Sequence, residues 1–210
     1  MLQLPIVQSV ISAFRLPDLR RKILFTLAIL VIYRLAAHVP LPGVDRVALA
    51  QLFQSNQLLG MIDLLSGGAM SNFSVVAMGV YPYITASIII QLILPIFPSL
   101  QEMVKEGGEA GRQKLNQYTH WLTIPMAALQ GIGQAALLAN QNPPILKNFG
   151  FSGENLLPTL SILITMTAGT MFAMWLGELI TREGIGQGIS IIIFGGIVAA
   201  SNNEISGPFA

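Results

Sequence analysis

Residues 58–98 of this chain read LLGMIDLLSGGAMSNFSVVAMGVYPYITASIIIQLILPIFP, and no charged residue lies between Asp63 and Glu102. The stretch is apolar enough for a membrane, but it is not one uniform helix. A short amphipathic piece ends at a Ser-Gly-Gly break over residues 66–68, and a longer apolar run resumes at Phe73. Because a simple spanning helix would be continuous, this break indicates a more elaborate membrane structure.

The longer apolar run has two further interruptions. Pro82 stands near its middle, and the polar side chains of Thr85, Ser87 and Gln91 are spaced along it. A helix that only anchors a protein in the membrane requires neither a proline at mid-span nor a row of polar side chains. Both features are expected in a protein that opens a path through a membrane. This stretch therefore predicts part of a transport pathway rather than a membrane anchor.

The composition excludes several classes of protein. Hydrophobic residues make up 53% of the chain and charged residues 10%, whereas a soluble domain carries about a quarter charged residues. Cysteine is absent, which excludes a disulfide framework and a cysteine metal site. The net charge of +1 argues against nucleic acid as a partner, because phosphate binding requires a basic face.

No pattern of residues indicates catalysis. The chain shows no nucleophile–base pair, and His38 and His120 are expected on opposite sides of the membrane, where they cannot share a metal ion. The glycines of residues 184–188 lack the preceding strand that a dinucleotide-binding loop requires. We therefore expect no enzymatic activity, no cofactor and no metal site, so that energy for transport would come from partners.

Five segments come close to the roughly 20 apolar residues that a spanning helix requires. The weakest is the last, whose dense apolar core covers only residues 189–200. We predict an all-α membrane protein with five transmembrane helices. They cover residues 23–39, 73–97, 118–139, 156–177 and 187–202.

Basic residues collect on one side of these predicted spans, as they do in cytoplasmic loops. That side carries Arg15, Arg20, Arg21, Lys22, Lys105, Arg112, Lys114 and Arg182. The other side carries only Arg46 and Lys147. We therefore predict a cytoplasmic N-terminus over residues 1–22, cytoplasmic connections over 98–117 and 178–186, and a C-terminus on the far side.

A secretory signal is the alternative for residues 20–33, which combine a basic start with an apolar run. His38 spoils the small-x-small pattern that cleavage would require, which disfavours this alternative. Many channels and transporters consist of two inverted halves with a pathway between them. An odd number of spans fits one such half, and residues 206–210 read as a connection between halves.

Several motifs resemble the SecY family, whose members are channel subunits of the bacterial protein translocon. They occur in the order of the family and cover most of residues 15–200, with a likeness to cyanobacterial and plastid members. The motifs are residues 33–35 and 40–45 for the first span and external loop, 63–68 for the plug, 78–91 for the second span, 105–112 for the next cytoplasmic loop, and 177–194 for the fourth loop and fifth span.

The resemblance implies a fold and a function. Residues 1–210 would form the N-terminal half of an inverted-repeat channel of ten helices, with a plug half-helix over 58–69 before the second span. Such a channel translocates unfolded preproteins across the membrane and releases transmembrane segments laterally into it. The implied location is the inner (plasma) membrane, with the thylakoid membrane left open as a second one.

The resemblance also implies partners. They are SecE, which clamps the two halves, SecG, SecA, the ribosome, preproteins that carry a signal sequence, membrane lipid, and the missing C-terminal half of the channel. No nucleic acid is implied apart from that of the ribosome.

By resemblance, Val80 and Ile84 of the second span and Ile189 and Ile193 of the fifth form the pore ring. Apolar constrictions of this kind gate by dewetting. Each pair is spaced i, i+4 and so lies on one helical face. Val80 replaces the isoleucine that the family pattern leads us to expect, which would leave the ring slightly wider. The alternative is that these side chains only face lipid or a neighbouring helix.

The resemblance assigns the plug to a short segment that cannot span a membrane. A half-helix of this kind is stable only where protein or a water-filled cavity receives its open end, and its aspartate is costly to bury unpaired. The alternative is a helix lying on the membrane surface between two spans. The plug residues are Gly60, Met61, Ile62, Asp63, Leu64, Leu65, Ser66, Gly67 and Gly68.

The second span would also form one wall of the lateral gate, through Pro82, Thr85, Ser87, Ile88 and Gln91. A proline inside a helix removes a backbone hydrogen bond. The polar side chains of the set could bond across a helix seam, at about 1 kcal/mol each. The alternative is that they only satisfy the backbone that the proline frees.

Three charged residues remain to be placed. Arg34 lies inside the first span, where a charge is by default a functional hypothesis. We favour hydrogen bonds from it to backbone carbonyls near the plug, with snorkelling or substrate contact as alternatives. Glu178 and Arg182 are spaced i, i+4, which predicts a local ion pair.

Two rival functions are left. Half of a small-molecule or ion transporter would show an unpaired carboxylate or histidine at mid-span, and spans two to five show none. An inactive truncated fragment is the second rival, because a single half leaves its pore face uncovered.

Overall fold

The computed structural model describes residues 17–41, 43–55, 72–141, 144–146, 149–150 and 152–205. Its regular elements are helices, and within these ranges the only β-pairing is two isolated bridges, Pro40 with Ser74 and Val44 with Leu146. The predicted all-α class is confirmed. The helices are α2 (Pro17–Ala37), α3 (Arg46–Ser55), α5 (Tyr81–Ile93), α6 (Pro98–Glu106), α7 (Gly108–Ala139), the 3₁₀-helix η1 (Gly153–Asn155), α8 (Leu156–Glu183) and α9 (Gly188–Ile205).

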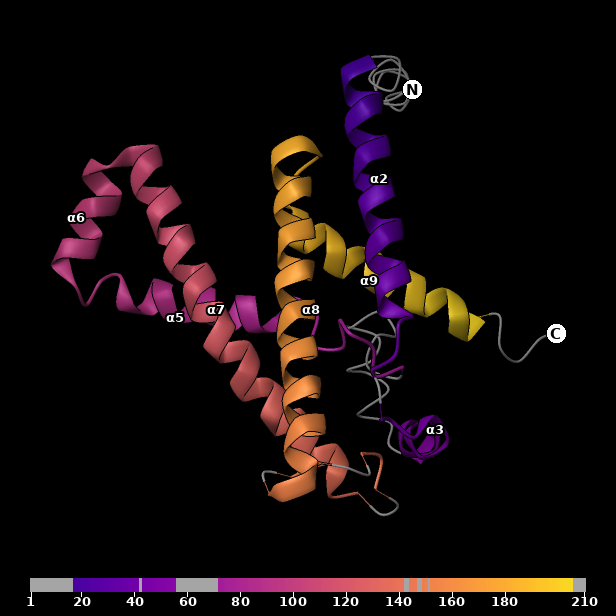
Figure 1. Ribbon diagram of the computed structural model, residues 1–210. Helices are drawn as coiled ribbons and strands as arrows, with labels where there is room; N and C mark the ends of the chain where they lie inside the picture. The colour runs from indigo at the N-terminus through magenta and orange to yellow at the C-terminus, as the bar shows by residue number, and fades with distance from the viewer. Residues whose placement is uncertain are drawn as a thin grey trace.

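Helix α8 is the centre of the arrangement, because α2, α5, α7 and α9 all pack against it. Figure 1 shows α2 and α8 upright and antiparallel, with α7 inclined across α8 and with α5 and α9 lying across the upright helices. Helix α6 folds back along the first part of α7. The start of α2, the start of α7 and the end of α8 therefore share one end of the molecule.

Two hydrophobic clusters form the core. The first joins α7 and α8 to the segments around Leu49, Phe73 and Ile145. The second joins α2, α8 and α9 to the segment that leads into α5, with Tyr33 and Ile192 among its buried members. Because the predicted pore residues come from α5 and α9, the second cluster is the one that concerns function.

The described residues contain two helices that are long and apolar enough to cross a membrane. They are α7 and α8, the latter taken together with η1. The pair α5 and α6 would count as a third span although it is bent by 101°. Helix α2 carries charges near both ends, and the apolar part of α9 covers only Gly188–Val198. Five transmembrane helices remain a prediction.

The second predicted span differs from the observed helix. Residues 75–80 form turns, and α5 begins only at Tyr81, so that Pro82 stands in its first turn. A proline there removes no helical hydrogen bond, because the first amides of a helix have no partner within the helix. The expectation of a proline in mid-helix was therefore wrong. A turn is favoured by Gly79, whose φ of 53° suits glycine.

The predicted cytoplasmic connection over residues 98–117 is helical. Helix α6 covers its first half, and α7 begins at Gly108, well before the predicted span. Similarly, α8 continues to Glu183 and so contains most of the predicted connection over 178–186. Polar residues extend these helices because charged side chains of high helix propensity directly precede the apolar run of α7 and directly follow that of α8.

Candidate functional site

The four predicted pore residues lie in the second hydrophobic cluster. Val80 is 5% exposed, and Ile84, Ile189 and Ile193 pack partly buried against the same cluster. The two pairs are far apart in the sequence, so only the tertiary structure could bring them together. Their proximity is a structural observation, whereas their role as a pore ring stays a prediction.

Close backbone packing positions the first pair. A Cβ atom built on Gly169 of α8 would overlap the carbonyl oxygen of Val75, so glycine allows the turn before α5 to lie directly on α8. Val80 ends that turn, and its carbonyl oxygen accepts a hydrogen bond from the Ile84 amide at 3.1 Å. The two residues therefore lie one helical turn apart, and both side chains contact the second hydrophobic cluster.

A threonine positions the second pair. The Thr181 hydroxyl donates to the Gly177 carbonyl at 3.0 Å and accepts from the Gly188 amide at 2.9 Å. It thereby joins the last turns of α8 to the first amide of α9. Because α9 begins at this joint, the joint sets where Ile189 and Ile193 lie relative to α8.

One predicted gate residue bonds across a helix seam. The Thr85 hydroxyl of α5 accepts a hydrogen bond from Gln130 Nε2 of α7 at 3.3 Å and donates to the Tyr81 carbonyl at 3.2 Å. Pro82 is buried in the first turn of α5. Gln130 is a candidate gate residue that the sequence reasoning missed, although a glutamine in an apolar helix is a signal that could have found it.

The other gate residues lie on an outer face of α5. Gln91 Nε2 donates to the Ser87 hydroxyl at 3.2 Å, within the helix and not across a seam. Ile88 is 52% exposed and Leu92 is 64% exposed. This face of α5 is thus open to a further partner, lipid or substrate, while the opposite face packs on α7 and α8.

A set of polar side chains that the sequence reasoning did not connect joins α5, α7 and α8. Glu178 Oε1 lies 2.8 Å from His120 Nε2 and accepts a hydrogen bond from Asn116 Nδ2 at 3.3 Å. Asn116 Oδ1 accepts one from the Tyr83 hydroxyl at 3.3 Å. In this part of the structure Glu178 pairs with His120 and not with Arg182, so the predicted local ion pair was wrong. The carboxylate turns toward α7, which packs along α8 and offers two partners.

The structure gives few contacts for the remaining predicted sites. Residues 60–68, the predicted plug, lie outside the described residues. Arg34 lies half-buried in the last turn of α2, and its role stays a prediction. No group of three metal-binding side chains occurs among the residues that the structure describes.

Comparison with known proteins was made for the whole chain. The SecY family model matches residues 74–210. The Protein translocase subunit SecY of Streptomyces galbus is 45% identical over 196 residues, covering 89% of this chain and 44% of that protein. The subunit of Halalkalibacterium halodurans is 43% identical over 200 residues (95% and 45%), and that of Haemophilus influenzae is 42% identical over 190 residues (90% and 42%).

The chain thus spans less than half the length of these three relatives. The family model nevertheless matches well over half of this chain. The matched region includes α5, the turn before it, α8 and α9, which together supply all four predicted pore residues. The chain belongs to the SecY family.

Proposed function

We propose that this chain forms the N-terminal half of a protein-conducting channel. The observation that carries the proposal is the meeting of Val80, Ile84, Ile189 and Ile193 in one hydrophobic cluster, in a chain of the SecY family. Aliphatic side chains around a narrow path exclude water and ions, because water gains no hydrogen bonds among them. Aliphatic contacts are non-directional, so such a ring could yield to an unfolded chain and close again.

The proposal makes α5 one wall of a lateral gate. Thr85 and Gln130 would hold this wall to α7, with Pro82 buried in the first turn of α5. Ser87, Ile88 and Gln91 would form the surface along which a signal sequence leaves for the lipid. One neutral hydrogen bond contributes about 1 kcal/mol. Contacts of this strength allow a gate to close without locking it.

The proposal places the plug at residues 60–68, in the connection between α3 and the turn before α5. A plug would close the path on the far side of the hydrophobic ring. It would leave when the gate opens. Two barriers in series explain how a channel wide enough for a polypeptide could hold back ions at rest.

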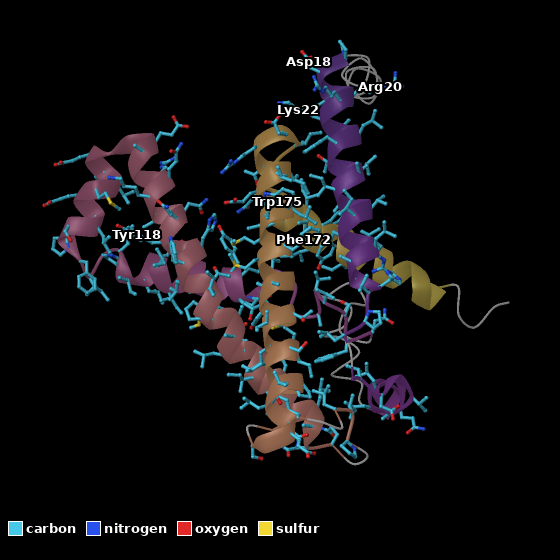
Figure 2. All side chains as sticks on the ribbon, in the orientation of Figure 1. Asp18, Arg20, Lys22, Tyr118, Phe172 and Trp175 are labelled. Carbon is cyan, nitrogen blue, oxygen red and sulfur yellow. The ribbon has the colours of Figure 1, made fainter. Side chains whose placement is uncertain are left out.

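The family and the two long apolar helices make the chain a multi-pass membrane protein. We place its N-terminus in the cytoplasm and the protein in the inner membrane. Figure 2 shows Arg20 and Lys22 at one end of the molecule, the end where α7 begins and α8 finishes. Lys114 and Arg182 lie near those two helix ends, and basic residues gather on the cytoplasmic side of membrane proteins.

The proposed function requires partners. A second chain or segment that supplies the remaining length of the SecY relatives would cover the open face of α5. The resemblance further assigns SecE, SecG, SecA, the ribosome and signal-bearing preproteins to the assembly. The energy for transport would come from SecA or from the ribosome.

Reconstitution in lipid vesicles tests the proposal. Ion conductance and preprotein import are measured for this chain alone, for this chain with a C-terminal half from a SecY relative, and for both with SecE. We expect import only when the second half is present. Flux of a small solute through this chain alone would instead favour a transporter, and the absence of any flux from every combination would favour an inactive fragment.

A further inference from the structure

Four polar side chains at the basic end of the molecule form a chain of contacts across three helices. We call them the clamp: Tyr83 of α5, Asn116 and His120 of α7, and Glu178 of α8. The Tyr83 hydroxyl donates to the Asn116 amide oxygen, and the Asn116 amide nitrogen donates to Glu178 Oε1, both at 3.3 Å. His120 Nε2 lies 2.8 Å from the same oxygen, and the Tyr83 and His120 rings lie 6.0 Å apart.

The charge of Glu178 gives the clamp a direction. A carboxylate can only accept hydrogen bonds, so the Asn116 amide must turn its NH₂ group toward α8. Its oxygen then points at α5, where only a donor fits, and the Tyr83 hydroxyl is that donor. One negative charge on α8 therefore decides which polar group α5 must present, although α5 itself carries no charge.

The clamp can open at low cost. The Glu178 and His120 side chains are 22% and 25% exposed, and His120 Nε2 is itself buried against Glu178. Separation of the two helices would therefore admit water to both groups from the exposed side. Two hydrogen bonds of 3.3 Å are weak links that contribute about 1 kcal/mol each. Links of this strength suit an element that moves.

We propose that the clamp is a latch that holds α5 against α7 and α8, with Glu178 and Asn116 as positioning residues for the gate. This inference rests on the proposed function, because α5 is the proposed gate wall. It assigns regulation of that wall to a site that lies about three to four turns before Gln130 on α7, at the end of the molecule where the basic residues lie. Release of the latch would free the start of α5, beside Val80 and Ile84.

The central test is Asn116→Asp, which keeps the side-chain shape and places a second carboxylate beside Glu178. The matched control is Gln117→Glu, which adds the same charge at the next position of α7, where the side chain is exposed. The chain has no cysteine, so spin labels can be attached at Leu92→Cys on α5 and Ile164→Cys on α8. Both positions are more than 60% exposed.

The distance between the two labels is measured by double electron–electron resonance, with the chain in lipid vesicles together with a C-terminal half and SecE. We expect Asn116→Asp to raise the population with a displaced α5 about fivefold, the change that roughly 1 kcal/mol produces. The control should match the unsubstituted chain. Identical distance distributions in Asn116→Asp and in the control would overturn the latch.

A milder variant covers the case in which Asn116→Asp does not fold. Tyr83→Phe removes one hydroxyl from the clamp and should raise the displaced population about fivefold, since it loses a single hydrogen bond of about 1 kcal/mol. An unchanged distribution in Tyr83→Phe would also overturn the proposal. Circular dichroism of each variant establishes that helix content is retained.

Transport is measured separately, so that the two proposals can fail independently. We expect Asn116→Asp to import a preprotein with a weakened signal sequence better than the unsubstituted channel does. Failure of the unsubstituted channel to import any preprotein would count against the proposed function, while the label distances still decide the latch. Displaced labels without a change in signal selection would limit the clamp to positioning α5 and would overturn its role in the gate.

Discussion

Single atoms decide how closely the segments of this molecule pack. Gly169 lies on α8 where the backbone of Val75 passes, and it is fully buried there. Gly133 on α7 is exposed, and a Cβ atom built on it would meet nothing within 4 Å. The two helical glycines therefore offer a matched pair for testing whether the turn before α5 lies on α8.

We expect Gly169→Ala and Gly133→Ala to change stability in opposite directions. The first forces a methyl group against a carbonyl oxygen and should destabilise the protein by roughly 1–3 kcal/mol. The second gains helix propensity and should stabilise it by up to about 1 kcal/mol. Thermal unfolding in detergent, followed by circular dichroism, gives both values, and a gain in stability for Gly169→Ala would contradict the observed packing.

A second residue-scale prediction concerns the outer face of α5. Within the described ranges Gln91 hydrogen-bonds to Ser87 of its own helix, and its exposed side chain can reach a partner on this face. We expect Gln91→Leu to narrow the difference in import between normal and weakened signal sequences about fivefold, the effect of one lost hydrogen bond. Gln117→Leu on α7 is the control, and equal selectivity in the two variants would remove Gln91 from the gate.

At the scale of elements, the helix boundary of α5 matters most. The sequence predicted a helix from Phe73, with a proline in its middle, and the structure has turns up to Val80. The apolar run is continuous across both parts, so hydrophobicity could not separate them. Gly79 was the available local signal, because glycine followed two positions later by an aromatic-proline pair is typical of a turn that leads into a helix. The structure gives Gly79 a positive φ.

Substitution of Gly79 separates the two interpretations. In a helix, Gly79→Ala would stabilise the protein by about 1 kcal/mol. At a φ of 53° it should destabilise the protein by roughly 1–2 kcal/mol. The added methyl group would only reach ordinary contact with the Tyr33 hydroxyl, at 3.5 Å, so the backbone alone determines the sign. Thermal unfolding of Gly79→Ala, compared with that of Gly133→Ala, shows whether the substitution stabilises or destabilises the protein.

At the scale of the whole molecule, exposed apolar faces bear on the proposed second half of the channel. The outer side chains of α2 and α5 are largely apolar and exposed, among them Leu24, Leu35 and Leu92. Lipid can cover such faces, and a second half of the channel can cover that of α5. The proposed pore needs this second half, because four side chains on one side of a path do not form a closed ring.

Removal of residues 60–69 from the completed channel tests the proposed plug. We expect a higher resting ion conductance, because the hydrophobic ring would then be the only barrier to ions. Single-channel recording in planar bilayers measures the leak. Deletion of residues 98–107, which comprise α6 and Gly107, serves as the control of equal length. An unchanged conductance in the plug deletion would assign residues 60–69 to the membrane surface instead.

The candidate site was predicted in part. The resemblance to the SecY family indicated Val80, Ile84, Ile189 and Ile193, and the i, i+4 spacing of each pair agrees with one helical face. Polar contacts between residues on different helices were not predicted from the sequence. The sequence paired Glu178 with Arg182 one turn away, whereas the structure pairs it with His120 of another helix. Local spacing cannot report a partner that only helix packing brings near.

The sequence by itself determined the helical class, the apolar segments, the concentration of basic residues and the family, since each depends on composition, period or motif. Only the tertiary structure decided which segments meet. It placed α5 and α9 against α8, turned Glu178 toward α7 and set the Val75 carbonyl against Gly169. The physical reason is that apolar helices can pack on one another with several geometries. Close backbone contacts and polar side-chain contacts between residues far apart in the sequence select one of these geometries.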